Sequence, residues 1–544
     1  MGDPDYTAQG ARVLDPSMPN VLPSRLARST PMLLSRLKQV VPHSFFHRPI
    51  NSPSSTNFLH TLTGPTPKQL TALHEKHGGN QYALYNDLHA QFGDAMYQNK
   101  ADFGIDIVTL FHPRDIEQII RNEGPLPRGL GQALLPFSRF YEQHAPKGSN
   151  LGREQGKEWK RVRKVLAQFM MPPKQAQSYI PQLERVMQDC APLLPQHAND
   201  MGNFVPLMTY EMIVSILLDR TANIVTGNAN ALDAKFVHTS KTIFPSMARL
   251  MSPHEMPHFL AGTSTIYQEF EDNMLSIMAM GEEFIDEFDE RFVEAVEQGD
   301  PDASIMHCYF GKVRLHEPEA LTKHQMNVNF SNLIFAGVDT TSNVIQWMLY
   351  HIAQHQDVQS KMRKEYASVL NGQTLSSVTQ YKQLKYTKMV MKETYRMTPP
   401  VFGSARFLPN DFDLHVEATG ETATIPAETM VRLHPLPFLT EYSKDITWQD
   451  ADVFRPERWA KGDVESVMVS DVAQHPYLNI APFGVGKRMC MGARLAQVEI
   501  HSMFSRILQD YTVRLAQDSP VPIPTFNMGM ISCDPSPKYV FEKC

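Results

Sequence analysis

Residues 483–492 read FGVGKRMCMG, and this stretch is the most informative part of the 544-residue chain. It holds one cysteine, Cys490, with glycines before and after it and two cations, Lys487 and Arg488, just upstream. The glycines permit backbone conformations and close approaches that a Cβ atom would block. The two cations favour a thiolate over a thiol, because positive charge stabilises the anion. The stretch therefore predicts a lone thiolate ligand presented on a glycine-rich loop.

The same stretch resembles the signature of the cytochrome P-450 family, F-x-x-G-x-R-x-C-x-G, at all of its fixed positions. These positions are Phe483, Gly486, Arg488, Cys490 and Gly492. In that family a cysteine thiolate ligates the iron of haem b and favours cleavage of the O–O bond. The resemblance implies that Cys490 is the metal ligand and that Phe483 and Arg488 help to bind the cofactor. It also implies the cytochrome P-450 fold, which is mainly α with a small β region. A turn with a buried structural cysteine is the alternative.

The composition limits the classes of function. The chain is 42% hydrophobic, which is enough for a large core, and its net charge is −7 with no basic tract that would indicate nucleic-acid binding. Its five cysteines are few, odd in number and widely spaced, and none forms a C-x-x-C pair. Neither a zinc site nor a disulfide framework is indicated. No uninterrupted apolar run reaches about 18 residues, so no transmembrane helix is expected.

We expect one haem-thiolate monooxygenase domain over residues 76–544, preceded by a leader over residues 1–75. No Asp or Glu occurs between Pro16 and His74, whereas Arg, Lys and Ser are frequent there. Such acid-poor, Arg- and Ser-rich leaders are typical of organellar transit peptides. The leader predicts a mitochondrial location, peripheral on the inner membrane. A disordered leader on a cytoplasmic protein is the alternative.

After about residue 80 the hydrophobic period is mostly helical. Short β-type runs broken by Gly, Asn and Pro occupy residues 401–432. Residues 244–260 are rich in Pro, Phe and Met, which is typical of an interfacial membrane contact, a substrate-entrance lid or a packed loop. The expected helices cover residues 110–122, 154–170, 205–218, 235–243, 274–296, 326–353, 358–370 and 386–397.

Residues 336–341 read AGVDTT in the middle of an expected helix. Glycine costs about 1 kcal/mol relative to alanine there, and the paired threonines add a smaller penalty. The segment resembles the oxygen-activating helix of the family. By that resemblance Gly337 leaves room for dioxygen beside the haem, while Asp339 and Thr340 are catalytic and deliver protons. A threonine hydroxyl can also bond the carbonyl four residues earlier. A kinked helix with a polar pocket is the alternative.

Glu393 and Arg396 are three residues apart and so share one helix face. If exposed, such a pair would contribute under about 1 kcal/mol. They resemble the E-x-x-R pair of the family, which is buried and bridged by an arginine from a later loop, here Arg458. The resemblance implies a structural network that holds the Cys490 loop in place.

Four further side chains match haem-binding positions of the family. Trp159 and Arg163 lie one helical turn apart and resemble its W-x-x-x-R motif. Arg406 matches the arginine that follows the E-x-x-R helix, and Arg488 lies within the cysteine loop. By resemblance the three arginines bind the haem propionates. Ordinary solvated cations are the alternative.

Lys388 and Lys392 resemble the lysines with which the mitochondrial branch of the family docks an acidic ferredoxin. Two ordinary exposed lysines are the alternative, and a flavoprotein reductase would then be the electron donor. His355-Gln356 stands where that branch usually has Asn-Pro, and Ala493 stands where Arg is common. The chain therefore departs from the branch at these positions.

The sequence thus predicts a haem-thiolate monooxygenase that inserts one oxygen atom of O₂ into a small lipophilic substrate. The substrate would be sterol-, isoprenoid- or fatty-acid-like, and an external partner would supply electrons. A haem-thiolate isomerase or dehydratase acting on peroxides is one alternative. A non-enzymatic haem gas sensor is another. Substrate specificity is expected to depend on the loops 125–150, 235–262 and 401–407. Their residues do not indicate which substrate binds.

Overall fold

The computed structural model divides the chain into two units, Met1–Arg48 and Pro49–Cys544. Most of the expected leader lies outside the described residues, but its last part contains helix α2, Pro67–Lys76, which belongs to the second unit. The described residues are 62–78, 80–100, 105–129, 131, 134–145, 150–252, 255–300, 303–401, 403–434, 450–460, 483–527 and 530–544.

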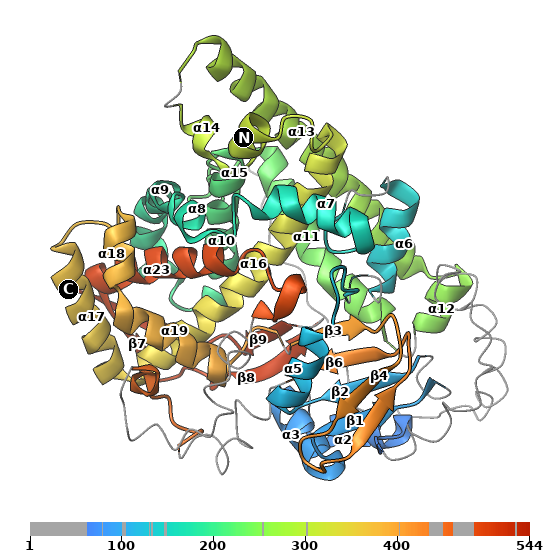
Figure 1. The fold of residues 1–544 in the computed structure, drawn as a ribbon. Helices are drawn as coiled ribbons and strands as arrows, with labels where there is room; N and C mark the ends of the chain where they lie inside the picture. The colour runs from blue at the N-terminus through green and yellow to red at the C-terminus, as the bar shows by residue number, and fades with distance from the viewer. Residues whose placement is uncertain are drawn as a thin grey trace, which may run out of the picture. The chain divides into compact units, whose positions relative to one another are not determined.

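Helices predominate in the described part of the chain, which confirms the mainly α fold (Figure 1). Short 3₁₀ helices are η4 (Ala191–His197), η5 (Pro456–Trp459) and η7 (Gly486–Arg488). After α2, the α-helices are α3 (Gln81–Phe92), α5 (Pro113–Arg121), α6 (Leu135–His144), α7 (Gly156–Ala167), α8 (Pro173–Gln177), α9 (Ile180–Cys190), α10 (Met201–Leu218), α11 (Ala231–Leu250), α12 (Met256–Ala261), α13 (Thr265–Glu297), α14 (Ser304–His307), α15 (Tyr309–His316), α16 (Lys323–Gln354), α17 (Gln356–Leu370), α18 (Val378–Gln383), α19 (Lys385–Met397) and α23 (Ala493–Asp510).

The strands are short and form small sheets, as the sequence predicted. They are β1 (Ala95–Gln98), β2 (Ile107–Leu110), β3 (Ser404–Phe407), β4 (Phe412–His415), β5 (Thr422–Ile425), β6 (Met430–Leu433), β7 (Tyr511–Leu515), β8 (Ile523–Asn527), β9 (Met530–Asp534) and β10 (Tyr539–Lys543). The largest described sheet has the order β1-β2-β6-β3, and only its β2–β6 pair is parallel. The pairs β4–β5, β8–β9 and β7–β10 are antiparallel.

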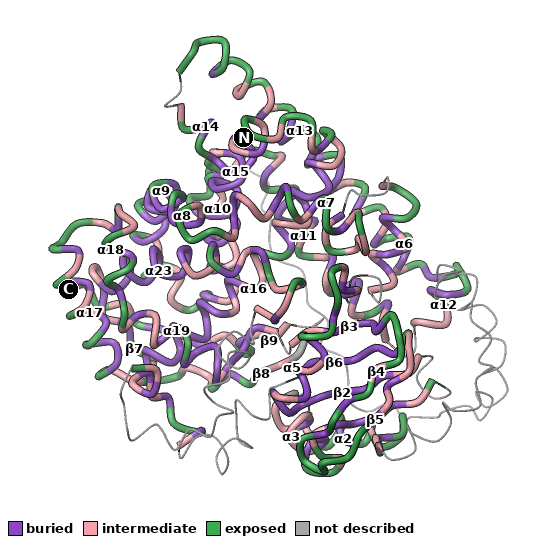
Figure 2. Tube along the Cα trace, viewed as in Figure 1, coloured by how far each residue is buried: buried purple, intermediate pink, exposed green. Residues whose placement is uncertain are grey.

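Helix α16 is the core helix of the described unit. It begins at a capping box, in which Thr322 and Gln325 satisfy each other's backbone N–H groups. From Thr341 to Ala353 every residue except Asn343 is buried (Figure 2). Helix α13 approaches it closely at Gly281, where a Cβ atom would lie 2.1 Å from Asn327 Oδ1. The position of α16 is therefore fixed by packing along most of its length.

Helix α10 packs against α16 and is the one described helix that could cross a membrane by length and composition. The mean hydropathy of Met201–Leu218 is 1.4, but 78% of this window is buried inside the fold. A core helix of a soluble protein meets the same criterion, so this observation is weak evidence for a membrane span.

The described residues of the segment 244–260 are mostly helical, whereas the sequence left a membrane contact, a lid or a packed loop open. Helix α11 continues through Pro245 to Leu250, and α12 begins at Met256. Met247, Leu250 and Phe259 are buried, so the apolar side chains of this segment mainly contribute to the core. The packed alternative therefore fits these residues better than a membrane contact.

Candidate functional site

The loop that carries Cys490 is closed by its own backbone. The N–H of Cys490 donates a 2.8 Å hydrogen bond to the carbonyl of Phe483, and the 3₁₀ turn η7 lies between them. Helix α23 begins three residues after Cys490. The Phe483 ring contacts the Tyr395 ring edge-on, with centroids 5.2 Å apart. The loop thus presents one thiol on a tightly closed turn.

Cys490 has exposed side-chain surface, yet desolvation is the largest influence on its pKa and raises it. These observations agree if the sulfur borders an enclosed space and not the outer surface. Backbone N–H groups of Gly492 and Ala493 and the charge of Arg163 act in the opposite direction. The sequence assigned the supporting charge to Lys487 and Arg488, and that assignment is wrong. Their side chains turn away, and Lys487 Nζ donates to the carbonyl of Gly124.

Glu123 holds the cysteine loop from the end of α5, and sequence reasoning missed this role. Its carboxylate accepts a 2.6 Å hydrogen bond from the N–H of Lys487 and forms a 2.7 Å ion pair with Arg406. Gly486 has φ +73°, and a Cβ there would lie 2.7 Å from Glu123 Oε1. Glycine is therefore required at 486 by both the backbone and the carboxylate. Nothing in the spacing of the sequence points to this role, because Glu123 and Lys487 are 364 residues apart.

Three of the predicted cofactor-binding residues, Arg163, Arg406 and Arg488, cluster around this loop. Arg163 Nη2 donates to the carbonyl of Met489 at 2.7 Å, and Arg488 Nε donates to the carbonyl of Pro127 at 2.9 Å. Burial and the charges of Arg406 and Arg163 lower the pKa of Arg488 to about 9, against the opposing effect of Glu123. Three cations thus share one buried carboxylate, which leaves an excess of positive charge.

Trp159 lies beneath this cluster on α7. Its side chain is buried, and the guanidinium carbon of Arg488 lies 4.0 Å from the ring centroid. Arg163, one turn further along the helix, lies 5.6 Å from the same ring. The indole face therefore supports both cations, an arrangement that stabilises them where they are desolvated.

The network around Glu393 is fully buried, which confirms the prediction. Glu393 forms 2.9 Å ion pairs with both Arg396 and Arg458, and Trp459 Nε1 donates to it at 2.9 Å. Burial favours the neutral carboxyl, but the two arginines lower the pKa of Glu393 below its ordinary value. Arg396 also donates to the carbonyl of Ala451. The network fixes α19 against the segment around η5.

The centre of α16 differs from the rest of that helix. Residues 336–340 all have accessible surface, although buried turns flank them. Thr340 Oγ1 donates to the carbonyl of Ala336 at 2.6 Å, as the sequence predicted. A Cβ at Gly337 would lie 3.4 Å from Ile213 Cδ1, which is close to an ordinary van der Waals contact, so the packing of α10 does not by itself require glycine here. The weak point of the helix therefore borders a space inside the protein.

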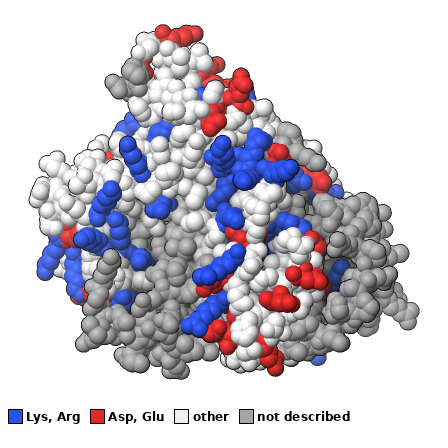
Figure 3. All heavy atoms as spheres, viewed as in Figure 1, with Lys and Arg blue, Asp and Glu red and all other residues white. Residues whose placement is uncertain are grey.

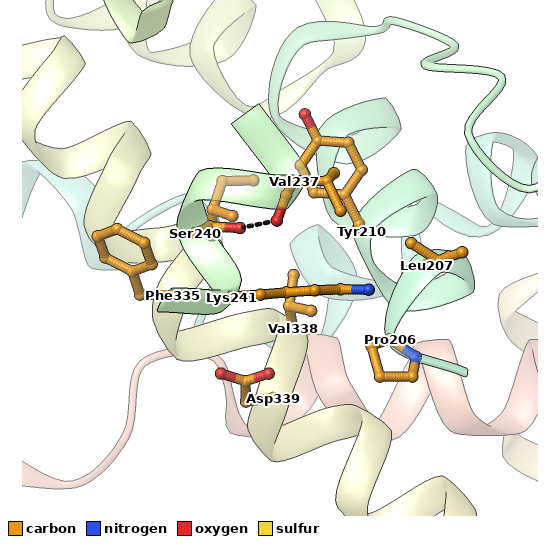
Figure 4. A pocket seen from close by; sticks show the side chains of 10 residues that line it. Pro206, Leu207, Tyr210, Val237, Ser240, Lys241, Phe335, Val338 and Asp339 are labelled. Carbon is orange, nitrogen blue, oxygen red and sulfur yellow. Dashed lines mark hydrogen bonds between the residues drawn. The ribbon is translucent and has the colours of Figure 1, made fainter. Parts of the chain in front are cut away.

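Asp339 projects from this stretch into a pocket between α10, α11 and α16 (Figure 4). Burial raises the pKa of its carboxyl to about 6, and the charge of Lys241 opposes that shift. Two residues on, Thr341 Oγ1 lies 3.5 Å from Glu499 Oε2 of α23. This contact places the centre of α16 beside the helix that follows Cys490.

Lys388 and Lys392 lie on α19. Their ammonium groups lie 4.5 Å and 5.1 Å from the ring centroids of Tyr381 and Trp459, and burial lowers both pKa values. Lys392 is exposed and Lys388 half-buried. Figure 3 shows Lys and Arg gathered over α7 and around α17–α19 on one face. Lys388 and Lys392 lie on α19, and the charges of Lys382 and Lys385 act on Lys388, so we call the surface with these four lysines the basic region.

Comparison with known proteins decides the family. The family model described as Cytochrome P450 matches residues 63–541. The chain belongs to the cytochrome P450 family. Its cofactor is accordingly a haem held through a cysteine thiolate, and the chain is an enzyme of the monooxygenase type. The match begins at residue 63 and so includes α2.

Several relatives in this family are mitochondrial hydroxylases. The chain is 25% identical to the mouse mitochondrial 1,25-dihydroxyvitamin D(3) 24-hydroxylase, over 89% of each chain. It is 28% identical to the human mitochondrial 25-hydroxyvitamin D-1 alpha hydroxylase, over 85% of this chain and 88% of the relative. It is 25% identical to the rat mitochondrial sterol 26-hydroxylase, over 77% and 78%. Similarity to these enzymes indicates an external electron donor.

The residues present fit a haem. Cys490 offers the only thiol of its loop, and its sulfur is accessible within enclosed surroundings. The three arginines exceed Glu123 by two charges, which is what two propionate carboxylates would neutralise. The donor set thus agrees with the cofactor of the family. Arg163, Arg406 and Arg488 remain predicted ligands of its propionates.

Proposed function

We propose that the chain is a mitochondrial monooxygenase that hydroxylates a small lipophilic substrate with electrons from a ferredoxin-type partner. The observation that carries this proposal is the accessible centre of α16 close to the helix that follows Cys490. An isomerase or dehydratase that rearranges peroxides has no need of the Asp339–Thr340 pair. The chain keeps this pair, and both residues lie in the accessible stretch of α16.

The haem, when bound, supplies the activation of O₂. Cys490 would bind its iron, and the excess positive charge of Arg163, Arg406 and Arg488 would hold its propionates. The buried Glu393 network keeps the loop rigid so that the sulfur stays in place. On α16, Asp339 would take up protons, and Thr340 would pass a proton on while its hydroxyl remains oriented by the Ala336 carbonyl.

A lipophilic substrate agrees with the side chains around the accessible stretch. Phe335 precedes Ala336, and its ring lies 6.3 Å from the rings of both Phe137 on α6 and Phe244 on α11. Apolar and aromatic walls with few polar groups are typical of sites for small lipophiles. The relatives act on sterols and vitamin D compounds, so we place the substrate among sterol-, isoprenoid- or fatty-acid-like molecules.

Two further features support the electron path and the location. The basic region that includes Lys388 and Lys392 would attract an acidic ferredoxin. The relatives are named as mitochondrial, and the acid-poor leader has the composition of a transit peptide. A flavoprotein reductase and a cytoplasmic location are the competing assignments.

The proposal is tested by measuring product formation with an electron-transfer chain and O₂, and separately with an organic hydroperoxide alone. We expect hydroxylated product with ferredoxin, its reductase, NADPH and O₂, and the substrate would be found by Soret shifts over a library of lipids and sterols. An isomerase or dehydratase would instead convert an organic hydroperoxide without reductant. A gas sensor would bind ligands without turnover under either condition. Either of those results would reject the monooxygenase assignment.

A further inference from the structure

Glu123 contacts both halves of the predicted cofactor site from the turn that follows α5. Its Oε1 accepts a hydrogen bond from the N–H of Lys487 at 2.6 Å, and its Oε2 accepts one from Arg406 Nε at 2.7 Å. The side chains of Glu123 and Arg406 are each only 3% exposed, so water does not compete for the ion pair. One buried carboxylate therefore joins the loop that carries the thiol to a cation predicted to bind the haem.

The charge of Glu123 acts on the whole arginine cluster. Burial lowers the pKa values of Arg163 and Arg488, and Glu123 opposes that shift at both. Among the described residues no second carboxylate forms an ion pair with Arg163, Arg406 or Arg488. Lys487 adds little charge to the cluster, because its side chain is exposed and water screens it. Without Glu123, three arginines and two propionates would leave one positive charge uncompensated.

Glu123 also orients Arg406. Arg406 Nη2 donates to the carbonyl of Val485 at 2.7 Å, and Nη1 donates to the carbonyl of Ala405 at 3.0 Å. Together with the ion pair to Glu123, these bonds occupy three of the five N–H groups of a guanidinium. No described residue accepts from the other two. The guanidinium is therefore held in one orientation with donors left for an anionic ligand.

A fixed charge beside a haem affects how readily the haem is reduced. Reduction adds one electron to a buried cofactor. A nearby negative charge disfavours this step and a nearby positive charge favours it, because charges interact strongly where water is excluded. Hydrogen bonding and burial around a haem are among the means by which a protein sets its reduction potential. The net charge of the arginine cluster should therefore influence that potential.

We propose that Glu123 is a positioning residue that aims Arg406 at the cofactor and, by its negative charge, lowers the reduction potential of the haem. The electron comes from the external donor, and the carboxylate itself gains and loses neither an electron nor a proton. The inference rests on the part of the proposed function in which the arginines hold the propionates. It does not depend on which substrate or which electron donor is used.

Spectroelectrochemical titration of the full-length, haem-loaded protein tests the inference without turnover. Glu123→Gln keeps the size of the side chain and an acceptor for the N–H of Lys487, but removes the charge. At a fixed applied potential the ratio of ferrous to ferric haem should rise about tenfold, equal to an upward shift of about 59 mV for one electron. Arg406→Gln should shift the potential downward, because it removes a positive charge.

The double variant separates charge from bracing of the loop. Glu123→Gln combined with Arg406→Gln restores the net charge of the cluster, so its potential should return close to the wild-type value. If Glu123 only braced the loop, both single variants would shift the potential in the same direction and the double variant would deviate most. That result would overturn the inference.

Glu211→Gln is the matched control. Glu211 is a buried carboxylate on α10 that accepts hydrogen bonds from the backbone N–H groups of Ala222, at 3.0 Å, and Ile224. It forms no ion pair with an arginine of the cluster, so its loss should leave the potential unchanged. An equal shift in Glu211→Gln and Glu123→Gln would overturn the inference.

The comparison of Arg406→Gln with the double variant isolates the same charge if Glu123→Gln does not take up haem. The double variant should then have the higher potential, and equal potentials in the two would overturn the inference. The predicted contact of the arginines with the propionates fails by a different result, namely an Arg406→Gln variant whose haem affinity and potential both equal those of the wild type.

Discussion

The two sides of the site differ in how completely their polar groups are paired. On the cysteine side Glu393 has ion pairs at 2.9 Å with two arginines and a further hydrogen bond from Trp459. On the α16 side the Asp339 carboxylate accepts no hydrogen bond from a described residue. Burial of the Glu393 network carries a desolvation penalty, but its ion pairs hold one geometry. The Asp339 carboxylate, in contrast, can exchange protons.

The difference agrees with what each side has to do. The Glu393 network holds one geometry between α19 and η5, so its charges are buried and compensated. A proton-delivering group must change its charge repeatedly, so strong partners would hinder it. The direction of the pKa shifts follows this division, because the arginines lower the pKa of Glu393, whereas burial raises that of Asp339 to about 6.

The largest effect is expected at the ligand itself. Cys490→Ser should abolish the red-shifted Soret band of the reduced carbon-monoxide complex, the band after which the family is named, because an alcohol does not replace the thiolate. Cys544→Ser, which changes an exposed cysteine at the end of the chain, is the control and should leave the band intact. A normal band in Cys490→Ser would show that the ligand is another residue.

The buried network should contribute strongly to stability. Glu393→Ala removes the buried carboxylate that pairs with Arg396, and one of the two carboxylates that pair with Arg458, which also contacts Asp450 at 2.8 Å. We expect a loss of about 3–5 kcal/mol in the free energy of unfolding. Urea unfolding of the haem-loaded protein measures it. The matched control is Arg514→Ala, which breaks an ion pair whose partners are both about half exposed, and which should cost under about 1 kcal/mol. If both variants lost the same free energy of unfolding, the buried network would contribute no more to stability than an exposed ion pair, and the prediction would be wrong.

The α16 side should respond in coupling and not in stability. Thr340→Ala should retain haem and substrate binding but divert electrons to hydrogen peroxide, because the hydroxyl that passes a proton on is gone. We expect product per NADPH to fall about tenfold or more. The Soret shift on substrate addition serves as the internal control. Unchanged coupling would remove Thr340 from the proton path.

The smallest effect is expected on the basic face. Lys388→Gln together with Lys392→Gln should raise the apparent KM for ferredoxin about tenfold, equal to a little over 1 kcal/mol. The effect should shrink as salt rises, since exposed charges are screened over about 10 Å at 0.1 M. Substrate affinity should not change. An equal KM in variant and wild type would favour a flavoprotein reductase.

Sequence reasoning found the parts of the site whose geometry is local. The Glu393–Arg396 pair follows from helical spacing, and the Thr340–Ala336 hydrogen bond follows from the i to i−4 relation within a helix. The mainly α fold and the small β region also follow from short-range periodicity. These features were predictable because a helix fixes the relative positions of residues three and four apart.

The sequence by itself also determined the family, because the cysteine loop combines residue types and spacing that the iron ligand requires. Only the tertiary structure shows which charged side chains contact that loop and act on its thiol. Arg163, and not the adjacent Lys487, acts on the thiol, and Glu123 reaches the loop from more than 350 residues away.

Lys241 and Asp339 likewise line one pocket only because the fold brings α11 and α16 together. Such long-range contacts leave no periodic signal in the chain, since the packing of separate elements, and not their spacing in sequence, decides which side chains meet.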